Sequence, residues 1–414
     1  MARAAGRGST AAPRSPATAG DLGLMAGSPP EAPQLVTIGS WQEGPKNRWA
    51  FQHVSELVPS AVVSRGTGPV LPLPAATEQL ADVPLEGVSC GSTLEAFLHA
   101  TYTDGFLVLR DGRILCERYF NGMQPATRHV LHSVSKSLCG VLTGTLVESG
   151  VVDLGESVST YVPELWDSAY GDATVAQLLD MTASLEFNED YADPDSHVQA
   201  QDRAAGWRPR RIEDPQSSYD FLRALGPNGA HGRSFQYCSA TTDVLAWVLE
   251  RASGRRYQDI LADELWSRIG AEHDAFVTVD EAGFAFANGG VSVSLRDLAR
   301  FGRLVLGGGS AGEHRACSAA WAARIRAGSD PKLMKGTDFA REFPRGSYRA
   351  QWWLTGDETS PFFGVGIYGQ FVWIDPAAGV VIVKLSSLPK ALDPAITRDH
   401  HRAFAAVAAA VAGL

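Results

Sequence analysis

The residues best suited to chemistry are Ser133 and Lys136, which stand three positions apart in the run SVSK. On a helix, residues at this spacing share one face, so the lysine amine can reach the serine hydroxyl. A serine at a helix N-terminus also lies beside free backbone N–H groups, which stabilise an oxyanion. The same two residues fit a simple N-cap and a surface lysine equally well. The pair therefore predicts an activated nucleophile only if further residues support it.

Other serines match short nucleophile motifs less well. The S-x-x-K spacing recurs at 329–332 and 387–390, but there a proline occupies the third position and indicates exposed loops. Ser89 lies in a G-x-S-x-G run at 87–91, a motif that needs a strand directly before it. Residues 82–86 instead contain a proline and two acids. These patterns favour Ser133 over Ser89.

Support for Ser133 comes from Tyr237, about a hundred residues downstream in the run YCS. Serine amidases and esterases that use S-x-x-K need a second proton-transfer group, commonly the tyrosine of a Y-x-N or Y-x-S element. Tyr119 also matches, in YFN, but it lies on a predicted strand and is interpreted as sheet packing. The order Ser133, Lys136, Tyr237 favours a serine hydrolase.

The elements that must position these residues follow from hydrophobic patterning. Residues 106–110 and 114–120 are rich in β-forming side chains and are joined by Asp-Gly, which predicts a hairpin. Residues 371–375 and 380–386 predict a second hairpin near the C-terminus. Between them, apolar residues recur with helical spacing at 138–146 and 244–249, each run ending at a glycine, and Ser294 begins a capping pattern before another helix.

This order predicts an α/β fold in which both ends of the chain build one antiparallel sheet flanked by helices. We expect a disordered tail over residues 1–40, a sheet domain formed by 41–155 and 285–414, and a mainly helical inserted domain over 156–284. The tail is rich in Ala, Gly, Ser and Pro and has no apolar run long enough for a secretory signal.

Longer stretches of sequence resemble the serine β-lactamase-like hydrolases, the family of class C β-lactamases, DD-peptidases and family VIII esterases. Within that family the chain is most similar to the nylon-oligomer hydrolases. The resemblance extends from about residue 41 to 387 and rests on WQEGPKNRWAF, TYTDGFLVLR, SVSKSLCG, NEDYADP, FQYCSATTDVLAWVLER, FANGGVS, GSYRAQWW, GIYGQ and VIVKLSS. It implies the β-lactamase-like fold.

The resemblance implies a catalytic role for each of four residues. Ser133 would attack an amide or ester carbonyl and form an acyl-enzyme, while Lys136 and Tyr237 share the proton transfers. The backbone N–H groups of Ser133 and Ile367 would form the oxyanion hole, which requires the segment at Ile367 to lie beside the start of the Ser133 helix. No metal and no organic cofactor is needed.

The resemblance also implies three substrate-binding residues, and two further residues are expected beside the substrate. Tyr191 corresponds to a lid tyrosine, and Asp202 to a carboxylate that holds a substrate ammonium group. Asn288 corresponds to a residue that improves amidase over esterase activity. The adjacent Trp352 and Trp353 fit either the lining of an apolar pocket or ordinary core packing, and we predict that Trp353 lines the pocket and that Gly366 borders it.

The chain departs from its family in the run GIYG at 366–369. β-Lactamases and DD-peptidases carry a K-T-G type element there, which binds a substrate carboxylate, so penicillin is not expected as the main substrate. Nylon-oligomer hydrolases usually have histidine where this chain has Tyr368. The departure concerns side-chain contacts with substrate and not the backbone oxyanion donor.

Three functions follow as hypotheses. The first is an amidase that cleaves linear 6-aminohexanoate dimer and small esters, which needs Asp202 and Asn288 to face the pocket. The second is a short-chain carboxylesterase of family VIII type, which does not need these two side chains to face the pocket. The third is an inactive acyl-binding protein, which predicts that a nucleophile or base is missing.

Composition and charge exclude other classes of protein. With 46 acidic and 36 Lys and Arg residues the net charge is −10, which opposes nucleic-acid binding.

The five cysteines show no C-x-x-C spacing and predict reduced thiols in a cytoplasmic protein. No apolar stretch approaches the roughly 20 residues that cross a membrane. The ten histidines form no metal-binding motif, and His400 and His401 are expected to be exposed. The expected partners are a small linear amide or ester and, by resemblance, a second copy of the chain.

Overall fold

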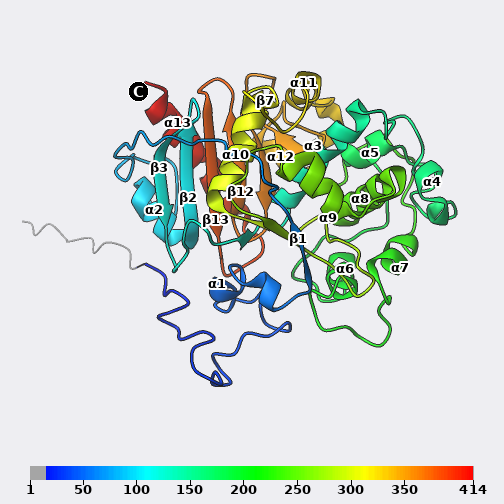
Figure 1. Ribbon diagram of the computed structural model, residues 1–414, viewed down its shortest axis with the longest axis horizontal. Coiled ribbons are helices and arrows are strands. Elements are labelled where there is room, and N and C mark those ends of the chain that lie inside the picture. The colour runs from blue at the N-terminus through cyan, green and yellow to red at the C-terminus, as the bar shows by residue number, and fades with distance from the viewer. Residues whose placement is uncertain (1–14, 414) are drawn as a thin grey trace, which may run out of the picture.

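A seven-stranded antiparallel sheet is the main feature of the computed structural model, which describes residues 15–413 (Figure 1). In spatial order its strands are β3 (Arg113–Tyr119), β2 (Thr103–Arg110), β13 (Val380–Ser386), β12 (Gln370–Asp375), β11 (Phe362–Gly366), β10 (Trp352–Leu354) and β9 (Ser347–Arg349). Both predicted hairpins are confirmed, as β2–β3 and β12–β13. Because β13 pairs with β2, the two ends of the chain build one sheet, as the sequence predicts.

The sheet is buried on both faces because apolar residues alternate along its central strands. In β2, Phe106 and Val108 face one core and Leu107 and Leu109 face the other. Helices α2 (Leu94–Ala100) and α13 (Pro394–Ala412) cover the first face, and α3 (Val134–Glu148) and α10 (Leu295–Leu306) cover the second (Figure 1).

The predicted helices are confirmed. The run 138–146 lies within α3, which ends just before Gly150, and the run 244–249 lies within α8 (Ser239–Ser253). Gly254 ends α8 in a left-handed conformation with φ of 69°, which glycine adopts without strain. The Ser294 hydroxyl accepts a hydrogen bond from the Asp297 N–H and so caps α10. Helix α3 is buried on all sides over its first three turns, which fixes the position of Ser133.

The remaining elements form a helical region and two small sheets. The helices and single turns are α1 (Asn47–Ala50), η1 (Val54–Glu56), α4 (Val158–Tyr161), η2 (Pro163–Leu165), α5 (Val175–Leu179), α6 (His197–Ala204), α7 (Ser218–Arg223), α9 (Tyr257–Leu261), η3 (Ala262–Trp266), α11 (Ala319–Ala327), η4 (Pro331–Met334) and α12 (Asp338–Glu342). The small sheets are β1 (Ser60–Val63), β5 (Ala275–Thr278), β6 (Val291–Val293) and β4 (His129–Val130), and the pair β7 (Ser310–Ala311) and β8 (His314–Arg315).

The helical region from α4 to η3 falls within the predicted insertion, 156–284, and gathers on one side of the molecule (Figure 1). One hydrophobic core nevertheless joins Leu138 of α3, Val248 of α8 and Val383 of β13. Strand β5 also lies within 156–284 but pairs with β1 and β6. The division into two domains therefore stays a prediction.

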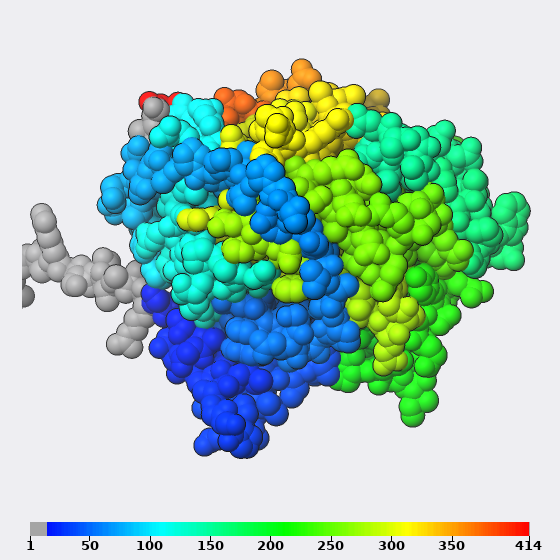
Figure 2. Space-filling view, in the orientation of Figure 1, coloured from blue at the N-terminus to red at the C-terminus, as the bar shows by residue number. Residues whose placement is uncertain are grey.

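The prediction of a disordered tail up to residue 40 is wrong for residues 15–40, and residues 1–14 lie outside the described chain. Residues 15–40 form a series of turns along the lower edge of the molecule (Figure 2). Val36 is buried there, and Met25 and Ile38 pack beside it against a cluster that includes Trp41. These apolar residues are too sparse to produce a periodic signal, but they bury enough surface to order the segment.

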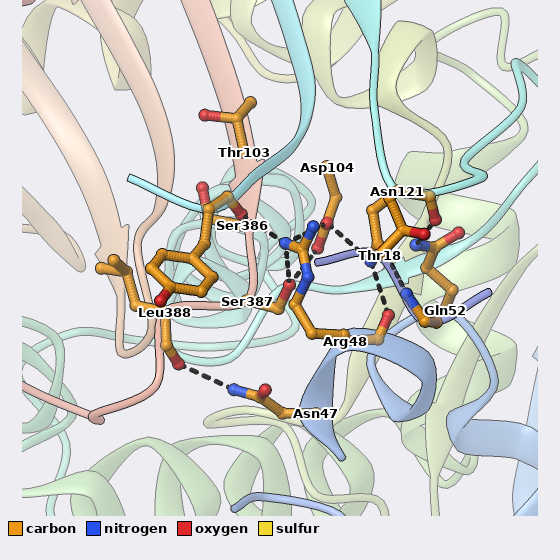
Figure 3. Close-up of polar contacts among 12 residues, drawn as sticks. Thr18, Asn47, Arg48, Gln52, Thr103, Asp104, Asn121, Ser386, Ser387 and Leu388 are labelled. Carbon is orange, nitrogen blue, oxygen red and sulfur yellow. Dashed lines mark hydrogen bonds and ion pairs between the residues drawn. The ribbon is translucent and has the colours of Figure 1, made fainter. Parts of the chain in front are cut away.

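A buried polar network fastens the N-terminal region to the sheet (Figure 3). Arg48 donates to Asp104 and to the hydroxyl of Ser387, at 3.0 Å in each case. Asn47 donates to the carbonyl of Leu388 at 2.7 Å. Asn121 donates to Asp104 at 2.9 Å and accepts from the N–H of Ala19. The network therefore holds the chain at 387–388, directly after β13.

The structure agrees with the prediction made for the cysteines and corrects the one made for two histidines. All five cysteines are free, and four of them are buried. His400 and His401 are buried in α13, so the expectation that they are exposed is wrong; the face of α13 that carries them packs on the sheet. Within residues 15–413 no cluster of three or more metal-binding side chains is present, and no helix is both long and apolar enough to cross a membrane.

Candidate active site

Ser133 stands at the start of α3, and its hydroxyl does not cap the helix. Instead Oγ accepts a hydrogen bond from Nζ of Lys136 at 2.9 Å. The interpretation of the pair as an N-cap and a surface lysine is therefore wrong, because Lys136 is only 1% exposed. Helical spacing brings the two side chains together, as the sequence predicts.

Three acceptors hold the Lys136 amine. Besides Ser133, Nζ donates to the hydroxyl of Ser239 and to the carbonyl of Asn288, at 3.0 Å in each case. Burial lowers the pKa of Lys136 below its ordinary value, and the carboxylates of Glu189 and Asp243 oppose that shift. A lowered pKa makes the neutral amine available, and a neutral amine can act as the base for Ser133.

Tyr237 packs against both members of the pair, immediately before α8. Lys136 Nζ lies 5.2 Å from the centroid of its ring, and the ring also stacks on Trp353 at 5.6 Å. Burial and the charge of Glu189 raise the pKa of Tyr237, and hydrogen bonding with Ser133 opposes the rise. The phenol is therefore protonated at neutral pH and can donate its proton to a leaving group.

The end of β11 lies beside the start of the Ser133 helix. A Cβ atom on Gly366 would stand 2.5 Å from the Leu131 carbonyl oxygen and 3.1 Å from Cβ of His132. Only glycine permits this approach, which explains why that residue borders the site. Within residues 15–413, the N–H groups of Ser133 and Ile367 donate to no other backbone atom outside the helices and strands. The placement that the oxyanion hole requires is present.

These residues surround a cavity of about 260 Å³. Six of the nine residues predicted for the site line it: Ser133, Tyr237, Tyr191, Trp353, Gly366 and Ile367. Lys136 lies directly behind Ser133. Trp352, the neighbour of Trp353, is instead buried in the core and stacks on Phe301.

Glu189 and Ser239 were not predicted from the sequence, yet they connect Tyr191 to Lys136. The Glu189 carboxylate accepts from the hydroxyl of Tyr191 at 2.6 Å and from the hydroxyl of Ser239 at 2.5 Å. Ser239 in turn accepts from Lys136. A Y-x-S motif contains Ser239 and could have identified it, whereas no motif marks Glu189.

Asp202 and Asn288 are not among the residues that line the cavity. Asp202 is 6% exposed and pairs with Arg208 at 3.1 Å. Asn288 donates its side-chain N–H to Asp243 at 2.7 Å, and only its carbonyl contacts Lys136. Asp243 also accepts from Gln201, so a buried carboxylate that the sequence did not identify organises this side of the site.

Tyr368, where the family usually has histidine, also points away from the cavity. Its backbone turns with φ of 63°, and its ring packs on Phe51 at 5.0 Å and on His132 at 5.3 Å. The tyrosine that departs from the family pattern therefore packs in the hydrophobic cluster that contains Phe51.

The competing serines are engaged elsewhere. Ser89 donates its hydroxyl to Asp399 at 2.5 Å, and Ser387 donates to Asp104 at 2.7 Å. The backbone N–H of Ser329 donates to the hydroxyl of Ser347 at 3.2 Å. None of these three serines lines the cavity or contacts a lysine amine at it.

Comparison with known proteins agrees with this geometry. A family model described as beta-lactamase matches residues 93–407, which is most of the chain. The chain belongs to the β-lactamase family. Its fold is therefore the β-lactamase-like α/β fold, and it is a serine hydrolase, so the resemblance found in the sequence is confirmed.

Individual relatives within the β-lactamase family are similar over nearly the whole chain. A protein of Paenarthrobacter ureafaciens named 6-aminohexanoate-dimer hydrolase is 48% identical over 89% of this chain and 90% of its own length. A Bacillus anthracis structure assigned to the 6-aminohexanoate-dimer hydrolases has 28% identity and a TM-score of 0.84, and covers 94% of this chain and 100% of its own. A family VIII carboxylesterase shares the fold, with a TM-score of 0.55 and 18% identity over 73% of this chain and 92% of its own.

Proposed function

We propose that this serine hydrolase cleaves the amide bond of linear 6-aminohexanoate dimer through an acyl-enzyme and also hydrolyses small esters. The observation that carries the proposal is the 2.9 Å hydrogen bond from Lys136 to Ser133 at the wall of an apolar cavity. The similarity to the Paenarthrobacter ureafaciens protein supplies the substrate class.

Acylation begins when the neutral amine of Lys136 takes the proton of Ser133. Ser133 Oγ then attacks the carbonyl carbon, and the N–H groups of Ser133 and Ile367 stabilise the negative oxygen that forms. Tyr237 donates its proton to the leaving nitrogen, and the proton on Lys136 restores the phenol. The C–N bond breaks and the free amine departs.

Deacylation reverses these transfers. A water molecule takes the place of the amine, gives its proton to the base formed by Lys136 and Tyr237, and attacks the acyl carbon. Ser133 leaves with a proton and the acid is released. The described residues supply every proton donor and acceptor that these steps use.

The substrate-binding residues that the sequence predicts enter this proposal in two groups. Tyr191, Trp353 and Gly366 line the cavity and would contact the amide and its polymethylene chains. Asp202 and Asn288 do not line the cavity and would act from outside it. Asp202 would attract a substrate ammonium group once its ion pair with Arg208 has opened. Asn288 acts on Lys136 through its carbonyl.

A short-chain carboxylesterase is the second candidate function. It is favoured by one observation, namely that the side chains of Asp202 and Asn288 do not line the cavity. An inactive acyl-binding protein is disfavoured, because Ser133, Lys136 and Tyr237 are all present and in contact.

The test compares hydrolysis of 6-aminohexanoate dimer with hydrolysis of p-nitrophenyl butyrate. We expect wild type to cleave both and Ser133→Ala to cleave neither. The matched control is Ser89→Ala, which removes the hydroxyl of the competing motif and should retain both activities. Ester cleavage without amide cleavage would establish the carboxylesterase, and full activity of Ser133→Ala would refute the mechanism.

We further propose that the protein acts in the cytoplasm and as a homodimer. The free thiols of all five cysteines support the first part, because reduced thiols are usual in that compartment. Light scattering of the purified chain measures the second part directly, and a monomeric mass would refute it.

A further inference from the structure

The two residues that flank the proposed oxyanion donors share a strained backbone conformation. His132 comes directly before Ser133 and has φ of 45°, and Tyr368 comes directly after Ile367 and has φ of 63°. Residues other than glycine rarely adopt this left-handed region, because Cβ then crowds the backbone. Surrounding contacts must therefore hold both residues in place. The mechanism above explains neither conformation.

The side chains of these two residues lie against each other and against Phe51. The ring centroids of His132 and Tyr368 are 5.3 Å apart, and Phe51 lies 4.8 Å from the first and 5.0 Å from the second. All three side chains are buried, and none of the three lines the cavity. One phenylalanine ring therefore contacts both sides of the proposed oxyanion hole without reaching the substrate.

His132 takes part in this cluster as an uncharged ring. Burial lowers the pKa of His132 well below its ordinary value, so the imidazole is neutral at ordinary pH. Trp41 and Trp207 enclose it further, with centroids at 6.4 and 5.7 Å. Although His132 is the neighbour of Ser133, its contribution is packing and not proton transfer.

Backbone hydrogen bonds fasten the same segments together. The carbonyl of Phe51 accepts from the N–H of Val130 at 2.9 Å, and Val130 is the last residue of β4. On the other side, the N–H of Leu388 donates to the carbonyl of Tyr368 at 3.2 Å. The carbonyl of Leu388 in turn accepts from the side chain of Asn47 (Figure 3). Residues 47–51 therefore hold both segments that carry the donors.

Phe51 and Trp41 lie before residue 93, where the match to the β-lactamase family begins. Both belong to the hydrophobic cluster that also contains Val36 and Tyr368. The family match therefore assigns no role to this N-terminal region, whereas its contacts lead directly to the active site.

We propose that Phe51 is a positioning residue, which keeps the backbone N–H groups of Ser133 and Ile367 where the tetrahedral intermediate needs them. Without its ring, His132 and Tyr368 can relax toward ordinary backbone angles. That relaxation turns the Ser133 N–H and shifts the segment that carries the Ile367 N–H. The role rests on the oxyanion donors of the proposed function, but not on the identity of the substrate.

An inhibitor that occupies the oxyanion hole tests this role directly. In n-propylboronic acid, boron takes the place of the carbonyl carbon of a butyryl group. Ser133 Oγ adds to the boron and gives its proton to Lys136, which leaves a tetrahedral anion that resembles the intermediate. We expect Phe51→Leu to raise the inhibition constant and to lower kcat/KM for p-nitrophenyl butyrate, both about tenfold or more. An unchanged inhibition constant in folded Phe51→Leu would overturn the proposal.

Phe301→Leu is the matched control for loss of a buried ring. Phe301 lies in α10, is as fully buried as Phe51 and does not line the cavity; its ring stacks on Trp352. The variant should lose stability as Phe51→Leu does, yet keep the inhibition constant and kcat/KM of wild type. An equal rise of the inhibition constant in Phe301→Leu would mean that general loosening explains the effect, and the proposal would be wrong.

Binding of a planar ligand separates the oxyanion hole from the rest of the cavity. Butyranilide is titrated calorimetrically into Ser133→Ala, with and without Phe51→Leu. Its carbonyl carries no full negative charge, so we expect the affinity to change less than threefold. A loss of anilide affinity as large as the loss for the boronic acid would show that Phe51 shapes the whole cavity, contrary to the proposal.

Tyr368→Leu and Tyr368→Phe test the other side of the contact and decide the proposal if Phe51→Leu does not fold. Neither replacement is glycine, so both keep the cost of the positive φ. Tyr368→Leu loses the ring and should raise the inhibition constant as Phe51→Leu does. Tyr368→Phe keeps the ring and should restore the value. Equal inhibition constants for these two variants would refute a role for ring contact.

Gly366→Ala, which displaces the Ile367 N–H directly, is the positive reference. If it raises the inhibition constant and Phe51→Leu does not, the oxyanion donors stand and the role of Phe51 is refuted. If neither variant raises it, the assignment of the donor is wrong as well. A wild type that cleaves the ester but not 6-aminohexanoate dimer would refute the amidase and leave the role of Phe51 to stand on the inhibition constants.

Discussion

Gly366 lies directly against Leu131, so that a Cβ atom at 366 would stand 2.5 Å from the Leu131 carbonyl oxygen. Leu131 comes two residues before Ser133, and Gly366 comes one residue before Ile367. The contact therefore brings together the two segments that carry the proposed oxyanion donors, the backbone N–H groups of Ser133 and Ile367. It joins two segments that are more than 200 residues apart in the chain.

Gly366→Ala should lower kcat about a hundredfold with a much smaller effect on overall stability. The added methyl group must push the end of β11 away from the start of α3, which moves the Ile367 N–H, and loss of one oxyanion donor costs roughly 10²–10³ in kcat. Steady-state kinetics on p-nitrophenyl butyrate measures this effect.

Gly68→Ala is the control for the glycine substitution. A Cβ there would meet only the carbonyl oxygen of Ser267, at 3.8 Å, so we expect wild-type kcat. If Gly366→Ala also keeps its kcat, Ile367 does not supply an oxyanion donor.

Much of the fold could be predicted because its signals are local. Asp111-Gly112 between two β-rich runs identifies the β2–β3 hairpin, and the apolar spacing before Gly150 identifies α3. Pairing of β13 with β2 has no such local signal, and it was inferred from the order of elements and from resemblance. The ordered segment at 15–40 was missed because only a few apolar residues, Val36 among them, hold it.

The site was predictable where one helix or one motif carries it. Ser133 and Lys136 share a helical turn, so spacing alone brings them together. Asp202 and Asn288 were expected to face the substrate, but the side chain of Asp202 pairs with Arg208, six residues farther along the chain, and that of Asn288 donates to Asp243 of α8. The first partner depends on the path of the loop after α6 and the second on a tertiary contact, and the spacing of residues reveals neither. The same reason explains why Glu189 was missed.

Glu189→Gln should move the acid limb of the kcat/KM profile to lower pH. The neutral form of Lys136 is the active one, so activity falls as pH decreases through its pKa. The Glu189 charge raises that pKa against the effect of burial, and its removal lets the pKa of Lys136 fall further. We also expect a lower kcat, because Ser239 and Tyr191 lose their charged acceptor.

A pH series from 5 to 10 on p-nitrophenyl butyrate measures this shift. Glu186→Gln serves as the control, since Glu186 is exposed in the same loop and does not line the cavity. An acid limb that moves to higher pH in Glu189→Gln would contradict the assignment of Lys136 as the base.

Asp202→Asn should raise KM for 6-aminohexanoate dimer about tenfold, with a smaller effect on p-nitrophenyl butyrate. A charge-assisted hydrogen bond to the substrate ammonium group is worth that much, and the ester has no such group. Loss of the pair with Arg208 should also destabilise the fold by roughly 1–2 kcal/mol, less than for a fully buried pair because Arg208 is partly exposed.

Asp195→Asn is the matched control, because Asp195 pairs with Arg211 at the surface and should change neither KM. Equal changes in KM for the dimer and the ester in Asp202→Asn would limit Asp202 to a structural role.

Lys384→Met tests the pH dependence of stability. Burial lowers the pKa of Lys384 to about 7, while in the unfolded chain it returns to its ordinary value of 10.5. Between these values the unfolded chain binds the extra proton, so the contribution of Lys384 to stability rises with pH from about 7 and levels off near 10.5. Relative to Lys384→Met, the free energy of unfolding of wild type should increase by up to about 1.4 kcal/mol per pH unit across this window.

Urea unfolding of both proteins at pH 6, 8 and 10 measures this difference in the free energy of unfolding. The control is Lys390→Met, which changes an exposed lysine and should show no such dependence on pH. A difference that is constant with pH would mean that Lys384 stays charged in the folded protein.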